Sequence, residues 1–258
     1  LNTCSVTENA NKDARKFVRT VRRKNPNATI AVIGCYAQLK PDEIINIPGV
    51  DYVVGMNEKL DVNSYILDNN NHNVSKINST FNISYSTNER TRAFIKIQDG
   101  CDYSCTYCTI PNARGISRSD TIDNTMLKIN RILRDDIKEI VLSGINIGDF
   151  GVKQNESFYK LLVELEKNNH LHRYRISSIE PNLINDDVIS VFKKSNKWVN
   201  HLHIPLQSGS DNILKSMKRR YDTKLYKNKI LKLKKIFPDL CIGVDVIVGF
   251  PGETDEDF

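Results

Sequence analysis

The sequence predicts an α/β protein in which a small amino-terminal α/β domain precedes a parallel (β/α) partial barrel. Two observations lead to this prediction. From residue 93 onward, short apolar runs of strand length recur about 30–45 residues apart, the spacing of a βα unit with its crossover. Amphipathic stripes with helical spacing fill the intervals between these runs.

The first elements along the chain alternate on a smaller scale. Residues 7–24 place apolar side chains at helical spacing among many basic ones, which predicts an amphipathic helix with a basic outer face. A strand is expected over 28–33, a helix after Pro41, a strand at 52–54 and a helix from 57 to about 67. This alternation favours a small α/β layer.

A polar stretch separates this layer from the rest of the chain. Residues 69–88 contain seven Asn and four Ser. Such a composition cannot bury enough apolar surface to fold alone. We therefore expect residues 1–68 to form an amino-terminal domain, 69–92 a linker and 93–258 the barrel.

The barrel is expected to contain five βα units in series. Strands are predicted at 94–97, 140–142, 174–176, 202–206 and 242–248, with helices at 122–133, 158–165, 188–192 and 226–237. Right-handed crossovers between such units form a parallel sheet that curls toward a barrel. A sixth unit is expected to begin at Glu253. We interpret the chain, which starts at Leu1, as a fragment truncated at both ends.

Composition excludes several classes of protein. The net charge of +6 and the hydrophobic content of 40% are ordinary for a globular chain and exclude collagen-like and wholly disordered classes. No apolar run approaches the roughly 18 residues that cross a bilayer, and no signal segment opens the chain. We therefore expect a cytoplasmic protein without a membrane partner. Six cysteines are too few for a disulfide framework in 258 residues.

The spacing of three cysteines indicates metal chemistry. Cys101, Cys105 and Cys108 form a C-x3-C-x2-C motif directly after the first predicted barrel strand. Three thiolates at this spacing can each bind one iron of a cubane 4Fe-4S cluster and leave the fourth iron open to another ligand. The alternatives are a zinc site that lacks its fourth ligand and three structural thiols. We favour the cluster because short-spaced cysteines in a reducing compartment favour metal binding.

The motif, with the aromatic Tyr107 before its last cysteine, resembles that of the radical S-adenosylmethionine (SAM) superfamily. In that superfamily the open iron binds the amino and carboxylate groups of SAM, and one-electron reduction cleaves SAM to a 5′-deoxyadenosyl radical. The resemblance implies that Cys101, Cys105 and Cys108 are catalytic cluster ligands.

Further segments narrow the resemblance to the methylthiotransferases of that superfamily. They are residues 2–7, 34–38, 98–101, 108–115, 142–148, 177–181, 203–210 and 249–254. Segments 5–10 and 97–101 are most similar to the enzymes that act on threonylcarbamoyl-adenosine at tRNA position 37. The resemblance therefore implies methylthiolation of C2 of that base, next to the anticodon.

Other functions stay open at this stage. Related methylthiotransferases act on isopentenyl-adenosine in tRNA or on a ribosomal protein. A protein of another class would be a non-catalytic iron-sulfur or zinc protein that only binds RNA. A structural α/β domain with incidental cysteines is a third possibility.

The resemblance also implies a second, auxiliary 4Fe-4S cluster in the amino-terminal domain. Cys4 and Cys35 match the second and third of its three cysteines. The first is expected upstream of Leu1, the alternative being that this copy has lost the cluster. Cys241, inside a predicted strand, is expected to be a buried core residue.

Polar motifs follow the predicted barrel strands, where parallel sheets place their sites. The residues expected to bind the cofactor are Tyr107, Gly144, Asn146, Ser178, Glu180, Gln207 and Gly249. Ordinary turns and strand-end caps are the alternative for any one of them. His201 and His203 alternate on one strand, and we interpret them as core histidines rather than metal ligands.

The expected macromolecular partner is tRNA. Basic residues concentrate in 12–24 and 215–235, a pattern that usually marks a solvated face but also suits phosphate contacts. The target base would have to leave the anticodon loop stack to reach a buried cluster. The resemblance also implies an electron donor such as flavodoxin or ferredoxin.

Overall fold

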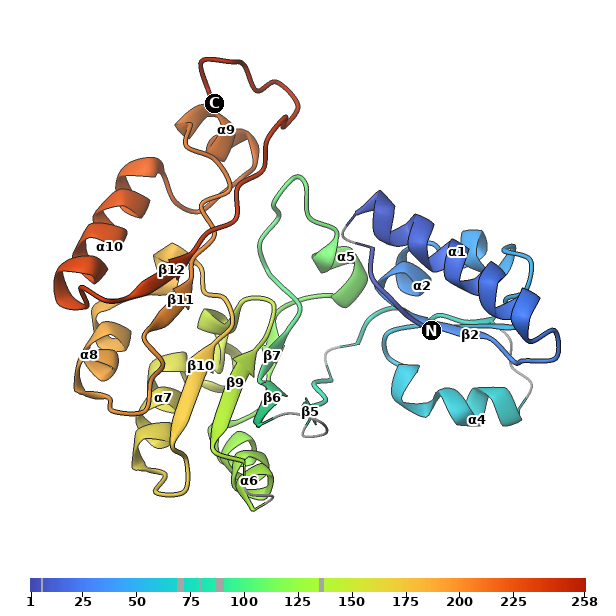
Figure 1. Ribbon diagram of the computed structural model, residues 1–258, viewed down its shortest axis with the longest axis horizontal. Coiled ribbons are helices and arrows are strands. Elements are labelled where there is room, and N and C mark those ends of the chain that lie inside the picture. Colours follow the sequence, from blue (N-terminus) through green and yellow to red (C-terminus); the bar gives the residue numbers. More distant parts are fainter. Residues whose placement is uncertain (6, 69–71, 79, 87–90, 135–136) are drawn as a thin grey trace. The chain divides into compact units, whose positions relative to one another are not determined.

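The computed structural model describes residues 1–258 except 6, 69–71, 79, 87–90 and 135–136 (Figure 1). It divides into two compact units, which are described separately. Unit 1 comprises residues 1–79 and 107–116, and unit 2 comprises residues 80–106 and 117–258.

Unit 1 contains a four-stranded parallel sheet in the order β1-β2-β3-β4. Its strands are β1 (Asn2–Thr3), β2 (Ala31–Gly34), β3 (Tyr52–Val54) and β4 (His72–Asn73). Its helices are α1 (Glu8–Lys24), α2 (Cys35–Leu39), α3 (Pro41–Ile45), the 3-10 helix η1 (Lys59–Asp61), α4 (Val62–Leu67) and α5 (Ile110–Arg114). Helix α5 packs against α2.

The longest helix of unit 1 shows why its sequence folds as it does. The Thr7 side chain caps α1 by accepting a hydrogen bond from the Ala10 amide at 3.1 Å. Basic residues in the last turn complement the negative end of the helix dipole. Val18 is buried in a small core that includes Tyr36, Ile44 and Val53.

The main sheet of unit 2 contains three parallel strands, whose residues pair directly across the sheet. The parallel strands of the main sheet are β6 (Arg92–Lys96), β9 (Glu139–Ser143) and β10 (Arg173–Ile176), and β5 (Ser84–Ser86) adds an antiparallel edge to β6. Ile95 and Ile176 both pair with Leu142, so one fully buried apolar row crosses three strands. A second parallel pair joins β11 (His201–His203) to β12 (Cys241–Gly243).

Helices between the strands cover the apolar side chains of unit 2. They are α6 (Ile122–Leu133), α7 (Phe158–Lys167), α8 (Asp186–Lys194), α9 (Asp211–Ser216) and α10 (Thr223–Ile236), with 3-10 helices η2 (Ile147–Asp149), η3 (Val152–Gln154) and η4 (Pro181–Leu183). Figure 1 shows α7, α8 and α10 on one side of the strands. Strands and helices form one continuous apolar cluster that runs from Ala93 to Leu240.

The predicted α/β class and the order of its strands and helices are confirmed. The last two predicted strands are shorter than expected, because β11 and β12 each end after three residues. The prediction that Cys241 is a core residue is wrong: its side chain is exposed. Among the described residues β12 pairs only with β11, so it is an edge strand with few side chains packed against it, and none of its three residues is buried.

Two features of the units differ from the simple order of predicted domains. Residues 107–116 group with the amino-terminal residues rather than with the barrel. Strands β4 and β5 lie inside the predicted linker. Residues 69–71, 79 and 87–90 of that linker are outside the described part of the chain. Val6, which belongs to segment 2–7, is also outside it. The limits 1–68, 69–92 and 93–258 stay a prediction. None of the described helices is both long and apolar enough to span a bilayer.

Candidate active site

A short antiparallel ladder closes the segment that carries the three clustered cysteines. Strand β7 (Gln98–Asp99) pairs with β8 (Arg118–Ser119), Gln98 lying opposite Ser119 and Asp99 opposite Arg118. Cys101 and Cys105 follow β7 in unit 2, on residues 100–106, which we call the cysteine loop. Cys108 lies in the stretch that belongs to unit 1, just before α5.

The three cysteines supply the thiol donors that an iron-sulfur cluster takes, and their environments differ. Cys105 is buried, and Cys101 and Cys108 are half-buried. The Cys101 sulfur accepts a hydrogen bond from the Tyr103 amide at 3.4 Å, and the Cys105 sulfur accepts one from Arg219 at 3.1 Å. Hydrogen bonds to the sulfurs are a general feature of protein-bound clusters. In the part of the chain that the structure describes, no three His, Cys, Asp or Glu side chains converge as a metal-ligand group.

Gln98 connects the base of the cysteine loop to the end of β9. Its side chain is fully buried. The amide nitrogen donates to the carbonyl oxygen of Gly100 at 2.8 Å and to the Ser117 hydroxyl at 2.9 Å. The amide oxygen accepts from the backbone N–H groups of Ile145 at 2.9 Å and Asn146 at 2.7 Å. Gln98 therefore fixes the position of both segments with one side chain.

A buried carboxylate stabilises the same ladder. The Asp99 side chain is 3% exposed and forms ion pairs with Lys96 at 3.0 Å and Arg118 at 3.6 Å. It also accepts a hydrogen bond from the Gly100 amide at 2.9 Å. Two cations and a backbone donor compensate the cost of burying this charge.

The loop after β9 holds two of the predicted cofactor-binding residues. Asn146 is buried and donates to the Asp149 carboxylate at 2.7 Å, while its own Oδ1 has no hydrogen-bond partner among the described residues. Burial raises the pKa of Asp149, and the nearby charge of Asp102 adds to this effect. At Gly144 an added Cβ would lie 2.6 Å from a methyl group of Ile147, so close packing alone requires glycine there.

The end of β10 supplies Ser178 and Glu180. The Ser178 hydroxyl lies 3.0 Å from Nδ1 of His203, whose Nε2 lies 3.4 Å from the Asp245 carboxylate. Glu180 forms an ion pair with Arg219, and both side chains are largely buried. Ser178 and Glu180 therefore both follow β10 and bind side chains of the protein, and their predicted contact with a cofactor stays a prediction.

Two further predicted residues occupy turns with left-handed backbone. Gln207 has φ 68° and Gly249 has φ 75°. The Gln207 amide donates to the Asp245 carbonyl at 2.9 Å, and the Gln207 carbonyl accepts from Ile247 at 2.9 Å. Gln207 thus pairs with the chain beyond β12. At Gly249 an added Cβ would meet no neighbouring atom, so the left-handed backbone, and not close packing, accounts for glycine at this position.

In unit 1, Cys4 and Cys35 follow neighbouring strand ends. Thr3 of β1 pairs with Gly34 of β2, and each cysteine is the next residue. Gly34 has φ 102°, and an added Cβ would lie 2.4 Å from the Thr3 carbonyl oxygen, so only glycine allows this approach. Cys4 is exposed, whereas Cys35 is buried and accepts a hydrogen bond from Nε of Arg114 at 3.3 Å.

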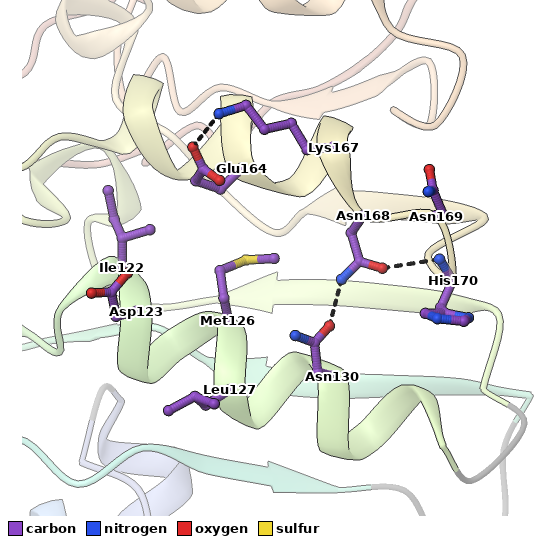
Figure 2. Close-up of a pocket in the computed structure, with 10 residues that line it drawn as sticks. All are labelled: Ile122, Asp123, Met126, Leu127, Asn130, Glu164, Lys167, Asn168, Asn169 and His170. Atoms are coloured by element: carbon purple, nitrogen blue, oxygen red, sulfur yellow. Dashed lines mark hydrogen bonds and ion pairs between the residues drawn. The ribbon is translucent and has the colours of Figure 1, made fainter.

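The pocket drawn in Figure 2 is unrelated to these residues. Figure 2 shows it between α6 and α7, with a volume of about 610 Å³ and none of the predicted site residues in its lining. Asn168 crosses it, donating to Asn130 at 2.6 Å and accepting from the His170 amide at 3.0 Å. A smaller pocket of about 180 Å³ lies beside the cysteine loop, where Asp102, Asp149 and Arg220 contribute to its lining.

Sequence reasoning missed two residues of this site. From the sequence, Gln98 is included only as part of segment 98–101 and is given no role. A polar residue directly after an apolar strand is a signal that could have indicated a buried hydrogen-bonding side chain. Arg219 belongs to a basic stretch suited to phosphates, yet its side chain is only 4% exposed. Neither of its contacts with Cys105 and Glu180 is encoded in a local pattern.

Comparisons with known proteins agree with the motifs. The profile of the Radical SAM superfamily matches residues 95–258, and that of a group described as Uncharacterized protein family UPF0004 matches residues 1–55. The whole chain is 44% identical to a threonylcarbamoyladenosine tRNA methylthiotransferase MtaB of Bacillus subtilis and 39% identical to that of Thermotoga maritima. It is 36% identical to a tRNA-2-methylthio-N(6)-dimethylallyladenosine synthase of Clostridium botulinum. The chain spans 60%, 61% and 60% of these three proteins, respectively.

Solved structures show the same fold at low sequence identity. The radical SAM methyltransferase TsrM of Kitasatospora setae, with cobalamin and a [4Fe-4S] cluster bound, matches with a TM-score of 0.66 and 13% identity, over 95% of this chain and 54% of that one. The cobalamin-dependent radical SAM enzyme OxsB matches with a TM-score of 0.60 and 13% identity, over 91% of this chain and 38% of that one.

Proposed function

The chain belongs to the radical SAM superfamily, and from this premise we propose that it is part of a tRNA methylthiotransferase. The proposed reaction is methylthiolation of C2 of threonylcarbamoyl-adenosine at tRNA position 37. The observation that carries the proposal is the cysteine loop, with Cys105 buried against Arg219 at the end of the barrel strands. The identities of 44% and 39% to two enzymes named for threonylcarbamoyladenosine, against 36% to a dimethylallyladenosine synthase, support this substrate.

Cys101, Cys105 and Cys108 would hold the 4Fe-4S cluster of this enzyme. When bound, the cluster and SAM together supply the one-electron chemistry that produces a carbon-centred radical. The remaining tasks belong to the chain itself. Gln98 and Asp99 fix the base of the cysteine loop, so that the thiols are presented from a rigid support.

Polar groups beside the loop are suited to orient the nucleoside and methionyl parts of SAM. Asn146 offers a buried carbonyl oxygen that has no partner in the described part of the chain, which suits an amino group. Ser178 and Glu180 offer a hydroxyl and a carboxylate at the end of β10. Tyr107, Gly144, Gln207 and Gly249 complete the proposed cofactor-binding set.

Cys4 and Cys35, with a cysteine outside this chain, would hold the auxiliary cluster. Their placement after paired residues of β1 and β2 supports this role. The partners proposed for the whole protein are the anticodon loop of tRNA and an electron donor such as flavodoxin or ferredoxin. Exposed lysines of α10 offer phosphate contacts to such a tRNA. The proposed location is the cytoplasm, where tRNA substrates reside.

The test uses the complete protein, reconstituted with iron and sulfide without oxygen. It is incubated with SAM, dithionite and tRNA that either carries or lacks the threonylcarbamoyl group, and nucleosides are analysed by mass spectrometry. We expect a methylthio product only on the threonylcarbamoylated tRNA. Equal product on both tRNAs, or product only on tRNA with isopentenyl-adenosine, would contradict the proposed substrate.

A second readout separates an enzyme from a non-catalytic RNA-binding protein. Release of 5′-deoxyadenosine from SAM is measured for the wild-type protein and for Cys105→Ser. The enzyme predicts release that depends on Cys105. Absence of release from the wild-type protein, with RNA binding unaffected by Cys105→Ser, would establish the non-catalytic alternative.

A further inference from the structure

The turn that follows α9 holds the cysteine loop from one side. The Thr106 amide donates to the Met217 carbonyl at 3.3 Å, and the Thr106 hydroxyl donates to the Ser216 carbonyl at 3.1 Å. Arg220 donates to the Asp102 carbonyl at 3.0 Å, and its guanidinium carbon lies 3.8 Å from the centroid of the Tyr103 ring. These contacts attach the loop to a segment more than a hundred residues later in the chain.

Arg219 lies at the centre of this attachment and reaches the sulfur itself. Its Nη1 donates to the Cys105 sulfur at 3.1 Å, and its Nη2 pairs with the Glu180 carboxylate. Its Nε donates to the Tyr221 hydroxyl at 3.2 Å, and the guanidinium lies 4.9 Å from the centroid of the Tyr221 ring. All three nitrogens of the guanidinium therefore have defined directions.

The backbone and Tyr221 restrict this guanidinium further. Lys218, the preceding residue, has φ 56°, and the Arg219 amide donates to the Leu214 carbonyl at 2.9 Å. The Tyr221 oxygen lies 2.8 Å from the carbonyl oxygen of Pro205, at the end of the β11 segment. Because its partners come from three separate elements, the guanidinium is placed before any ligand binds.

A positive charge at this position has a specific consequence for a cluster bound through Cys105. Reduction adds one negative charge to the cluster, and a cationic donor at a ligating sulfur stabilises the reduced state more than the oxidised state. Glu180 partly balances the charge of Arg219 but lies on the opposite nitrogen, so the donor that faces sulfur remains cationic. Such groups around the ligands are a recognised means of setting a potential.

We propose that Arg219 is a positioning residue that orients the Cys105 sulfur and raises the reduction potential of the cluster held by the cysteine loop. This inference rests on the proposed function, since it requires a cluster on these thiols. It differs from the phosphate-contacting role that the basic sequence around Arg219 indicates, because the side chain is buried and engaged in unit 2. It also gives Glu180 a second task, that of holding the guanidinium.

The experiment compares three variants of the complete reconstituted protein: Arg219→Gln, Arg219→Lys and Arg220→Gln. The last is the matched control, because it removes the same charge from the same turn, while the Arg220 guanidinium contacts the loop backbone and the Tyr103 ring rather than a cysteine sulfur. The reduction potential is measured by titration followed with electron paramagnetic resonance, and iron content and circular dichroism are recorded for each variant.

We expect Arg219→Gln to disfavour reduction at least tenfold, which corresponds to 59 mV for one electron. Arg219→Lys should restore part of this shift, because an ammonium keeps the charge but cannot bind Cys105 and Glu180 together. Arg220→Gln should shift the potential by less than half as much. Loss of iron from a folded Arg219→Gln protein, with iron kept by Arg219→Lys, would also support the positioning role.

Other outcomes would overturn the inference. An unchanged potential in Arg219→Gln, or equal shifts in Arg219→Gln and Arg220→Gln, would show that contact with the sulfur has no special effect. If Arg219→Gln does not fold, the neutral variant Arg219→Met replaces it, and a wild-type potential in that variant rejects the inference. A wild-type protein that binds no iron would instead contradict the proposed function, so the two failures are distinguishable.

Discussion

The two units each place an arginine on a buried cysteine, but they support that pair differently. In unit 2 the Arg219 guanidinium is also bound by Glu180 and Tyr221 and is 4% exposed. In unit 1 the corresponding donor is Arg114, a half-buried residue at the end of the five-residue helix α5. The surroundings of Cys105 are therefore fixed by several elements that are far apart in the sequence. Those of Cys35 are formed mainly where the two short helices α2 and α5 meet.

The hydrophobic core of unit 2 is also more extensive than that of unit 1. The apolar cluster of unit 2 includes side chains of β6, β9, β10 and β11 and of the helices that cover them. That of unit 1 is small and centres on Tyr36, Ile44 and Val53. Because local stability follows buried apolar contacts, unit 1 is expected to open before unit 2. The following predictions test this contrast, beginning with the largest effect.

Serine substitution of the two buried cysteines should separate their chemical roles. Cys105→Ser removes a proposed ligand of the SAM-binding cluster, so we expect loss of both 5′-deoxyadenosine and methylthio product. Cys35→Ser should abolish the methylthio product while radical formation from SAM persists. Each variant should lose roughly half of the iron of a protein with two cubane clusters. If Cys35→Ser also ended 5′-deoxyadenosine release, the proposed division of labour between the units would be wrong.

Truncation of one core residue in each unit should reveal two levels of stability. Leu142 and Ile44 are fully buried, and replacing either by Ala should cost about 2–5 kcal/mol. We expect Ile44→Ala to expose only unit 1, and Leu142→Ala to destabilise unit 2. Hydrogen exchange read by mass spectrometry measures the two units separately. Uniform loss of protection in Ile44→Ala would show instead that the units unfold together.

Two amide side chains that bind backbone groups, Gln98 and Gln38, offer a smaller comparison. Replacing Gln98 by Leu leaves the amides of Ile145 and Asn146 without their acceptor, at about 1–3 kcal/mol for each buried group. Gln38 of unit 1 performs a similar task, since it accepts from the Met56 amide at 2.8 Å and donates to the Ser75 carbonyl at 3.0 Å.

Gln38 is only half-buried, so water can replace some of the hydrogen bonds that the backbone loses in Gln38→Leu. Chemical denaturation should therefore show a greater loss of stability for Gln98→Leu. The comparison fails if Gln38→Leu is the more damaging substitution. Gln98→Leu should also lower the iron content, because the base of the cysteine loop is no longer fixed.

The smallest expected effect is a difference in sensitivity to acid. Burial, with the charges of Arg175 and His203, lowers the pKa of His201 in unit 2. Its contribution to stability is therefore present above the ordinary histidine pKa of about 6.5 and is lost as the pH falls through the lowered value. In unit 1 the hydrogen bond from Tyr36 is the main cause that lowers the pKa of Glu43, so its contribution is lost only below about pH 4.3.

Thermal unfolding between about pH 7.5 and about pH 5.5 measures the first of these contributions. His201→Asn should flatten the pH dependence in that window, whereas Glu43→Gln should leave it unchanged there. A wild-type slope in His201→Asn would show that His201 contributes nothing to acid sensitivity.

Much of the fold is determined by local sequence. The apolar spacing that predicts α6 over 122–133 matches that helix, and the predicted strand at 52–54 coincides with β3. The C-x3-C-x2-C motif and the segments around it are sufficient to indicate the superfamily. These features succeed because helical and strand periodicities, caps and short motifs depend on residues close together in the chain.

Tertiary structure alone decided which polar side chains act together. The contact of Arg219 with Cys105 joins residues 114 positions apart, and that of Gln98 with Asn146 joins residues 48 positions apart. It also decided that Cys241 is exposed and that α5 belongs to unit 1. No local pattern encodes such pairs, because a basic run reads the same whether its arginine faces solvent or a buried sulfur. Only the folded chain places the Glu180 carboxylate, the Tyr221 phenol and the Cys105 thiol around the Arg219 guanidinium, and these contacts hold it in the interior.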